Sequence, residues 1–148
     1  MSDKPSRWCV LMPCSHAESW AVPQNCLAEI VTLHAVDAHP PPEISWRGQI
    51  VPVLDFGRRD GSRWYEKQRQ SGLIAIFRGL RGEGCDYWGV AIRGHGLTIR
   101  DVATQALEDA PEDTLAHASA AFRMDGRLYQ VPDLAQLQRE LAASLAVA

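Results

Sequence analysis

Short apolar segments separated by turn residues run along most of the chain. Residues 7–14 and 20–33 form the first two, and the second is broken near Pro23 and Asn25, where an extended element must bend. Three further short strands are expected at residues 73–80, 85–94 and 95–102. Glycine-rich turns separate these three, and this spacing predicts a meander of the kind that builds small β-barrels.

The last part of the chain carries two local signals. Asp125 and Gly126 stand between two apolar runs within residues 121–131, which is a strong signal for a β-hairpin. Asp133 can cap a helix, with Gln136 three residues further on. Leucines then recur on one face of that helix at positions 134, 137, 141 and 145. The pattern therefore predicts about eight to ten short strands followed by one C-terminal helix.

Two segments between these elements are not expected to be regular. Pro40, Pro41 and Pro42 exclude a helix and favour an ordered, extended connector. Residues 57–72 are polar, rich in arginine and bounded by glycine, which predicts a surface loop. The chain has five tryptophans, most of which should pack in the core; Trp64, in this loop, is the exception that we consider for an interface.

Length and composition describe an ordinary globular domain. A chain of 148 residues buries roughly two-thirds of the surface that its unfolded form exposes. Hydrophobic residues make up 46% and charged residues 22% of it, so disorder and a membrane class are both disfavoured. No apolar run approaches the roughly 20 residues of a spanning helix, and the first residues lack the apolar core of a signal peptide. We therefore expect a cytoplasmic protein with no membrane insertion.

The net charge of −3 hides an uneven distribution of charges. Residues 58–100 carry nine Lys or Arg against four acidic residues, whereas residues 101–148 carry three against eight. The basic and acidic segments can complement each other or a partner. The negative net charge, however, gives little support to nucleic-acid binding. A small β-barrel that binds nucleic acid through the arginine-rich segment 58–100 is nevertheless the alternative interpretation.

Candidate catalytic and metal-binding residues are dispersed. The cysteines and histidines lie at positions 9, 14, 26 and 85 and at positions 16, 34, 39, 95 and 117. The group formed by Cys9, Cys14 and His16 matches no common zinc spacing, so we predict no metal, no cofactor and buried reduced thiols. The histidines are expected in turns or at the surface. A metal- or thiol-dependent enzyme is the third possibility.

One charged residue stands out because it interrupts an apolar, strand-like run. Arg47 lies in EISWRGQIVPVLDFG, residues 43–57. A guanidinium is rarely buried without matching acceptors, and Glu29 and Asp55 are the candidate partners. Two interpretations stay open: an internal ion pair that locks two β-elements together, or a charge at the floor of a protein-binding groove.

The same run carries a resemblance to a known family. The segment RGQIVPVLDF resembles the Arg-Gly, apolar pair, Pro and hydrophobic-Asp-hydrophobic pattern of the CheW-like domain of bacterial chemotaxis coupling proteins. Similar segments precede and follow it in the family's order: WAVPQNCLAEIV at 20–31, LIAIFRGLRGEGCDYWGVAI at 73–92 and MDGRLYQVPDLAQL at 124–137. Together they cover nearly the whole chain, and the ordered set is more specific than any one segment.

This resemblance implies an all-β fold of two intertwined five-stranded SH3-like β-barrel subdomains with a C-terminal α-helix, in one domain spanning residues 1–148. It implies a non-enzymatic, cytoplasmic adaptor without a cofactor. Members of the family bridge a CheA-type histidine kinase to the cytoplasmic tip of methyl-accepting chemoreceptors. The chain would then be recruited to membrane-associated receptor arrays, with no role in nucleic-acid binding.

The resemblance also assigns a partner-binding region between the barrels. Arg47 falls on the family's groove arginine, Glu29 on an acidic residue and Leu27 on an apolar residue of the receptor-facing region. Gly48 and Ile50 complete the predicted set. The chain departs from the family at residues 42–46, where Gly-hydrophobic-x-Asn-Leu/Ile is common, and at position 93, where arginine replaces the usual aspartate. Because specificity resides in such substitutions, a paralogue serving another pathway, such as type IV pilus twitching motility, is a natural interpretation.

Overall fold

The computed structural model describes residues 7–34, 39–58, 61, 63–64, 71–80, 85–93 and 97–147. Within these residues the strands are β1 (Trp8–Pro13), β2 (Ser19–Pro23), β3 (Leu27–His34), β4 (Glu43–Trp46), β5 (Gln49–Leu54), β6 (Ser71–Arg78), β7 (Tyr87–Ile92), β8 (Thr98–Asp101), β9 (Glu108–Asp109), β10 (Ala118–Met124) and β11 (Arg127–Pro132). Helix α1 spans Leu134–Val147, and short 3-10 helices occupy Gln24–Cys26 (η1), Phe56–Arg58 (η2), Val102–Thr104 (η3) and Pro111–Asp113 (η4).

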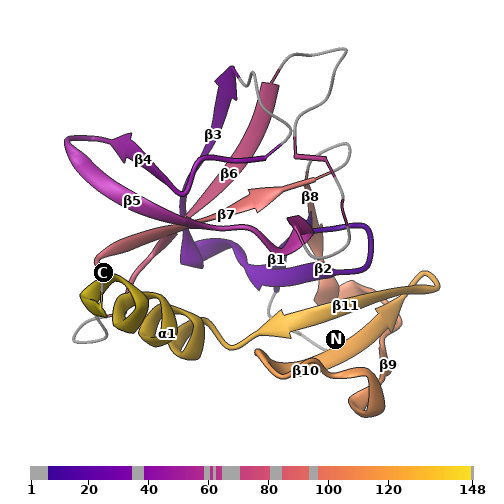
Figure 1. The fold of residues 1–148 in the computed structure, drawn as a ribbon. Coiled ribbons are helices and arrows are strands. Elements are labelled where there is room, and N and C mark those ends of the chain that lie inside the picture. Colours follow the sequence, from indigo (N-terminus) through magenta and orange to yellow (C-terminus); the bar gives the residue numbers. More distant parts are fainter. Residues whose placement is uncertain are drawn as a thin grey trace.

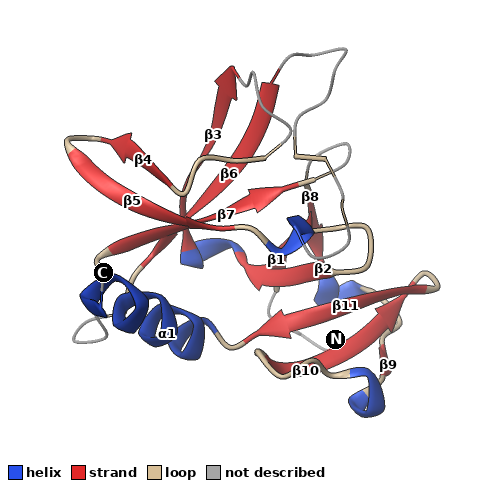
Figure 2. Ribbon diagram, in the orientation of Figure 1, coloured by secondary structure: helices blue, strands red, loops and turns tan. Residues whose placement is uncertain are grey.

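The strands form two curled sheets, shown in Figures 1 and 2. One is five-stranded in the order β3-β6-β7-β5-β4, and the other is six-stranded in the order β8-β1-β2-β11-β10-β9. Figure 1 places the first in the upper part of the view and β9, β10 and β11 below it, with α1 alongside. The predicted fold class, mainly β with two SH3-like barrels and a C-terminal helix, is confirmed; the sixth strand is the two-residue β9.

The chain crosses between the sheets twice, so the barrels are intertwined. Strands β1 and β2 belong to the six-stranded sheet, β3 to β7 form the five-stranded one, and β8 to β11 return to the first. The predicted break near Pro23 and Asn25 is η1, at which the chain makes its first crossing. The predicted meander is wrong: β6 and β7 pair, but β8 leaves them and pairs with β1 through contacts such as Val10 opposite Ile99.

Both faces of the central strands are buried, which explains their continuous apolar sequence. Along β6, Ala75 and Phe77 face the core between the two sheets, whereas Ile74 and Ile76 face a second core inside the five-stranded barrel. The inter-sheet core also contains Val10, Met12, Cys14, Trp20, Val22, Trp88, Val90, Ile92 and Leu137. A third cluster fills the six-stranded barrel and consists of Leu11, Ala21, Val102, Met124 and Tyr129. The inter-sheet core therefore joins both barrels and α1 into one body.

The two local signals near the C-terminus are confirmed. Asp125 and Gly126 have φ angles of 53° and 76°, as a type I′ turn requires, and they connect β10 to β11. The Asp133 carboxylate accepts a hydrogen bond from the backbone N–H of Gln136 at 3.1 Å, which caps α1. Leu137 is buried against the inter-sheet core.

A buried glutamine fastens α1 to the connection between β6 and β7. The Gln138 side chain is 1% exposed and accepts from the Leu80 N–H at 2.7 Å. Its amide nitrogen donates to the carbonyl oxygens of Leu80 at 3.1 Å and Cys85 at 2.7 Å. Gly79 permits this close approach, because a Cβ at that position would lie 2.3 Å from the Cys85 carbonyl oxygen. The predicted turn at 79–84 lies mostly outside the described residues.

Trp64 does not lie at an interface, contrary to the sequence-based expectation. It is 4% exposed and belongs to the core of the five-stranded barrel. Its indole N–H donates to the Leu73 carbonyl oxygen at 2.8 Å, and the ring packs against Gly72, where a Cβ would be only 2.3 Å from it. A polar loop can thus supply a core residue, which local composition does not reveal. Among the described residues, no helix is long and apolar enough to cross a membrane.

Candidate functional site

The Arg-Gly motif forms the tip of a hairpin. Arg47 and Gly48 have φ angles of 47° and 75°, so they make a type I′ turn between β4 and β5, with Trp46 opposite Gln49. The Arg47 side chain is 68% exposed. Of the two interpretations, an ion pair with Glu29 is present, but Arg47 lies at the surface rather than in the interior. The sequence pattern does not reveal this turn, because the strands on both sides of it are apolar.

Three side chains form a compact unit at this tip, which we call the Glu29–Trp46–Arg47 cluster. One carboxylate oxygen of Glu29 lies 3.6 Å from a guanidinium nitrogen of Arg47. The other accepts a hydrogen bond from the indole N–H of Trp46 at 2.5 Å. The Arg47 guanidinium lies over the Trp46 ring, 4.7 Å from its centroid, in a cation–π arrangement.

The cluster closes the five-stranded barrel. Strands β3 and β4 are the two edge strands of the five-stranded sheet, and we call the gap between them the seam of the barrel. The hydrogen bond from Trp46 on β4 to Glu29 on β3 crosses this seam. Trp46 is 7% exposed and packs against Tyr87, with ring centroids 4.9 Å apart. The ion pair itself is exposed at both members and therefore contributes little stability. Arg47 thus joins an ion pair across the seam while its guanidinium faces solvent.

Asp55, the other proposed partner of Arg47, pairs with Arg93 instead. An Asp55 carboxylate oxygen lies 2.5 Å from an Arg93 guanidinium nitrogen, and the side chains are 13% and 2% exposed. The same oxygen accepts from the Gly57 N–H at 3.1 Å. The Arg93 backbone N–H donates to the carbonyl oxygen of Pro13 at 2.6 Å. Arg93 is therefore held by a largely buried carboxylate, where the ends of β5 and β7 meet β1.

The remaining residues of the predicted partner-binding set occupy different surroundings. Gly48 is exposed in the turn beside Arg47. Leu27 begins β3 and packs in part against the inter-sheet core. Ile50 is 64% exposed on the outer face of β5, opposite Ser45, whereas its neighbour Val51 is fully buried. The structure brings Glu29, Arg47 and Gly48 together, and their contact with a partner stays a prediction.

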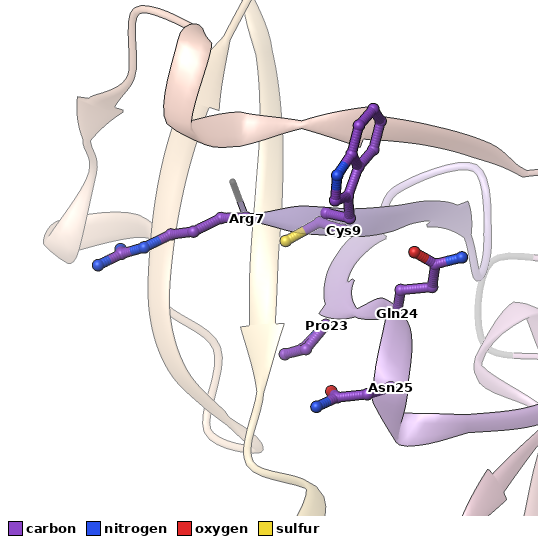
Figure 3. A pocket seen from close by; sticks show the side chains of 6 residues that line it. Arg7, Cys9, Pro23, Gln24 and Asn25 are labelled. Carbon is purple, nitrogen blue, oxygen red and sulfur yellow. The ribbon is translucent and has the colours of Figure 1, made fainter. Parts of the chain in front are cut away.

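A pocket that the sequence did not reveal lies immediately before Leu27. It measures about 500 Å³ and is lined by Arg7, Trp8, Cys9, Pro23, Gln24 and Asn25. Figure 3 shows Arg7 just before β1 and Cys9 on β1, with Pro23 at the end of β2 and Gln24 and Asn25 in η1. The pocket therefore sits where the chain first crosses between the barrels.

Two exposed apolar side chains lie beside this pocket. Trp8 is 51% exposed and Ile99 is 53% exposed. Trp8 pairs with Asp101 and Val10 pairs with Ile99, so Trp8 and Ile99 are diagonal neighbours on one sheet face. Exposed apolar patches of this kind are typical of protein contacts. No signal in the sequence distinguished Trp8 from a core tryptophan, because it begins an ordinary apolar strand.

The cysteines have the properties of structural thiols. All four are free, but only Cys14 is buried as predicted, whereas Cys9, Cys26 and Cys85 are partly buried. Removal from water raises the pKa of each thiol above its usual value, most strongly for Cys14. A raised pKa keeps a thiol protonated at neutral pH and weakens it as a nucleophile. Among the described residues, no three His, Cys, Asp or Glu side chains gather in a way that could hold a metal ion.

His117 departs from the expectation of a surface histidine. Its side chain is 20% exposed, and Nε2 lies 2.7 Å from a carboxylate oxygen of Glu18. Its ring stacks on Phe56 with centroids 5.0 Å apart. The same Glu18 oxygen accepts from the Trp20 indole N–H at 2.5 Å. This polar group packs between η2 and the start of β10, and its members come together only in the tertiary fold. His95 lies outside the described residues.

Comparison with known proteins identifies the family. The family model for the CheW-like domain matches residues 10–142. The fold is similar to a crystal structure of the scaffolding protein TtCheW from Thermoanaerobacter tengcongensis, with a TM-score of 0.59 and 20% sequence identity over 88% of this chain and 90% of that one. A search of curated proteins found no significant match. On the family match over nearly its whole length, the chain belongs to the CheW-like domain family.

Proposed function

We propose that this protein is a non-enzymatic adaptor that couples chemoreceptors to a CheA-type histidine kinase. The observation that carries the proposal is the match of residues 10–142 to the CheW-like domain. It is supported by the similarity of the fold to a protein described as a scaffolding protein. The raised pKa values of the buried thiols argue against thiol chemistry.

The receptor-facing surface would run from the hairpin tip to the pocket at the first crossover. It comprises the exposed Arg47, Gly48 and the seam carboxylate of Glu29, and continues through Leu27 to the pocket lined in part by Trp8. The kinase would bind elsewhere on the same body. Because one core joins the two barrels, the chain would hold its two partners at a fixed spacing, and repeated weak contacts in an array would add up to a stable assembly.

The test is binding of a purified chemoreceptor cytoplasmic fragment and of the kinase regulatory domain to wild type and variants. Arg47→Ala should weaken receptor binding about tenfold or more, because a charge-assisted contact is worth roughly 1.5–3 kcal/mol. Glu29→Lys should weaken binding as well, because it replaces the carboxylate beside Arg47 with a second cation. Circular dichroism should show both variants folded. The matched control is Arg127→Ala, which changes an exposed arginine beside the other type I′ turn. Unchanged binding by both site variants would remove this surface from the proposal.

The pathway is assigned by phenotype. Deletion of the gene should impair swimming chemotaxis if the adaptor serves a flagellar system, and twitching if it serves a type IV pilus system. The alternative of nucleic-acid binding through segment 58–100 predicts affinity for RNA or DNA that falls steeply with salt. Arg93, within that segment, is held in a buried ion pair and does not offer its charge to a phosphate backbone.

A further inference from the structure

Trp46 stands immediately before the Arg47-Gly48 turn and closes strand β4. Its indole makes three contacts that an aliphatic side chain cannot reproduce together. The N–H donates to Glu29, the ring face lies under the Arg47 guanidinium, and the ring packs on Tyr87. Trp46 therefore links the seam of the barrel to the exposed charge at the hairpin tip.

Because of Trp46, both carboxylate oxygens of Glu29 already have a donor nearby. One oxygen is held by the Trp46 N–H and the other lies 3.6 Å from Arg47. A carboxylate with a leucine beside it would lack the first contact and would be free to rotate toward the guanidinium or toward a partner's cation. With Trp46 present, Glu29 offers little to a cationic partner.

Arg47, in contrast to Glu29, is available to a partner. Its guanidinium has five N–H donors and no acceptor, its side chain is 68% exposed, and its ion pair with Glu29 is long, at 3.6 Å. The indole beneath it limits the orientations that the planar group can adopt, so less rotational freedom is lost when a ligand binds. The tip therefore presents a pre-oriented set of donors suited to a planar, anionic acceptor.

We propose that Trp46 is a positioning residue that makes Arg47 select a partner carboxylate, an Asp or Glu side chain on the docked segment. This inference rests on the proposed function, because the partner is then the chemoreceptor tip, and it adds the chemistry by which that tip is chosen. A receptor with a lysine or a neutral residue at the contact position would bind this protein poorly.

The experiment is a double-mutant cycle on the full chain, with the purified chemoreceptor cytoplasmic fragment as the probe. We expect Arg47→Gln to weaken binding about tenfold and Trp46→Leu about threefold to tenfold. In the Arg47→Gln background, Trp46→Leu should have no further effect, because Trp46 acts through Arg47. Trp46→Phe keeps a ring face but loses the N–H, and its affinity should be intermediate.

A matched control separates positioning from stability. Trp64→Phe alters another buried tryptophan in the same core, away from the hairpin tip. It should lower the melting temperature, as Trp46→Phe does, without changing receptor affinity. Equal loss of affinity in both variants would assign the effect of Trp46 to folding and overturn the inference.

The partner's charge is tested by reversal. Arg47→Glu should abolish receptor binding, and one Glu→Lys or Asp→Lys change among the acidic residues of the receptor tip should restore it. If no reversal restores binding, or if Trp46→Leu and Arg47→Gln weaken binding additively, the inference fails while the adaptor function stands. If the wild-type chain binds neither receptor fragment nor kinase, the proposed function fails, and the inference fails with it.

Discussion

Arg93 illustrates, at the scale of single residues, how a buried charge is accommodated. Its guanidinium, just after β7, is tolerated because Asp55 lies 2.5 Å away and both groups are largely removed from water. The cost of burying each charge is offset by the other, which makes the pair sensitive to loss of either member.

We therefore expect Arg93→Met to lower the free energy of unfolding by about 3–5 kcal/mol, because it leaves the Asp55 carboxylate buried without its counter-charge. The double variant Asp55→Leu with Arg93→Met should recover most of that loss. Urea denaturation measures both. Arg100→Met, which breaks an exposed pair with Asp125, should cost less than about 1 kcal/mol. A cost for Arg93→Met as small as that would contradict the role of the buried pair.

At the scale of elements, the sequence predicts features that depend on neighbouring residues and does not predict those that depend on tertiary pairing. The Asp125-Gly126 hairpin and the Asp133 cap depend on neighbouring residues alone, so the sequence predicts them. The Arg47-Gly48 turn has the same geometry but lacks a polar boundary, so the sequence pattern does not separate it from the strands on either side. The pairing of β8 with β1 depends on residues about 90 positions apart, which no local pattern encodes.

The hydrogen bonds of Gln138 should contribute to holding α1 against the rest of the fold. Gln138→Leu should preserve the helix face but remove the partners of the Leu80 N–H and the Cys85 carbonyl oxygen. An unsatisfied buried polar group costs about 1–3 kcal/mol, so the melting temperature should fall and amide hydrogen exchange in α1 should rise. Gln136→Ala removes an exposed contact with Glu140 and is the control that should change neither. Unchanged exchange in the Gln138 variant would show that α1 is held by its leucines alone.

At the scale of the whole molecule, one core serves both barrels. Phe77 stacks on Trp88 with ring centroids 4.7 Å apart, and Trp20 from the other sheet meets Phe77 edge-on at 6.2 Å. The sequence predicts two barrels from an ordered set of segments, and the family match agrees. It cannot predict which side chains meet between them, because those contacts depend on how the two sheets are oriented.

Phe77→Ala should accordingly destabilise both barrels together. The cavity left at a fully buried phenylalanine costs about 3–5 kcal/mol. Hydrogen exchange read by mass spectrometry should rise in β4 and β5 and in β10 and β11 alike, with one cooperative transition in urea. Exchange that rises in the five-stranded barrel alone would show that the barrels unfold independently.

The two crossings of the chain also set an order of events during synthesis. Residues up to Ile92 contain every strand of the five-stranded sheet, so that barrel can close while the ribosome is still translating. Strands β1 and β2 are made before that barrel but must wait for β8 and β11, which are made after it, to complete their own sheet. The nascent chain therefore holds an unfinished sheet edge and the exposed side of the shared core until β11 has been made, and during this interval the protein needs protection from aggregation.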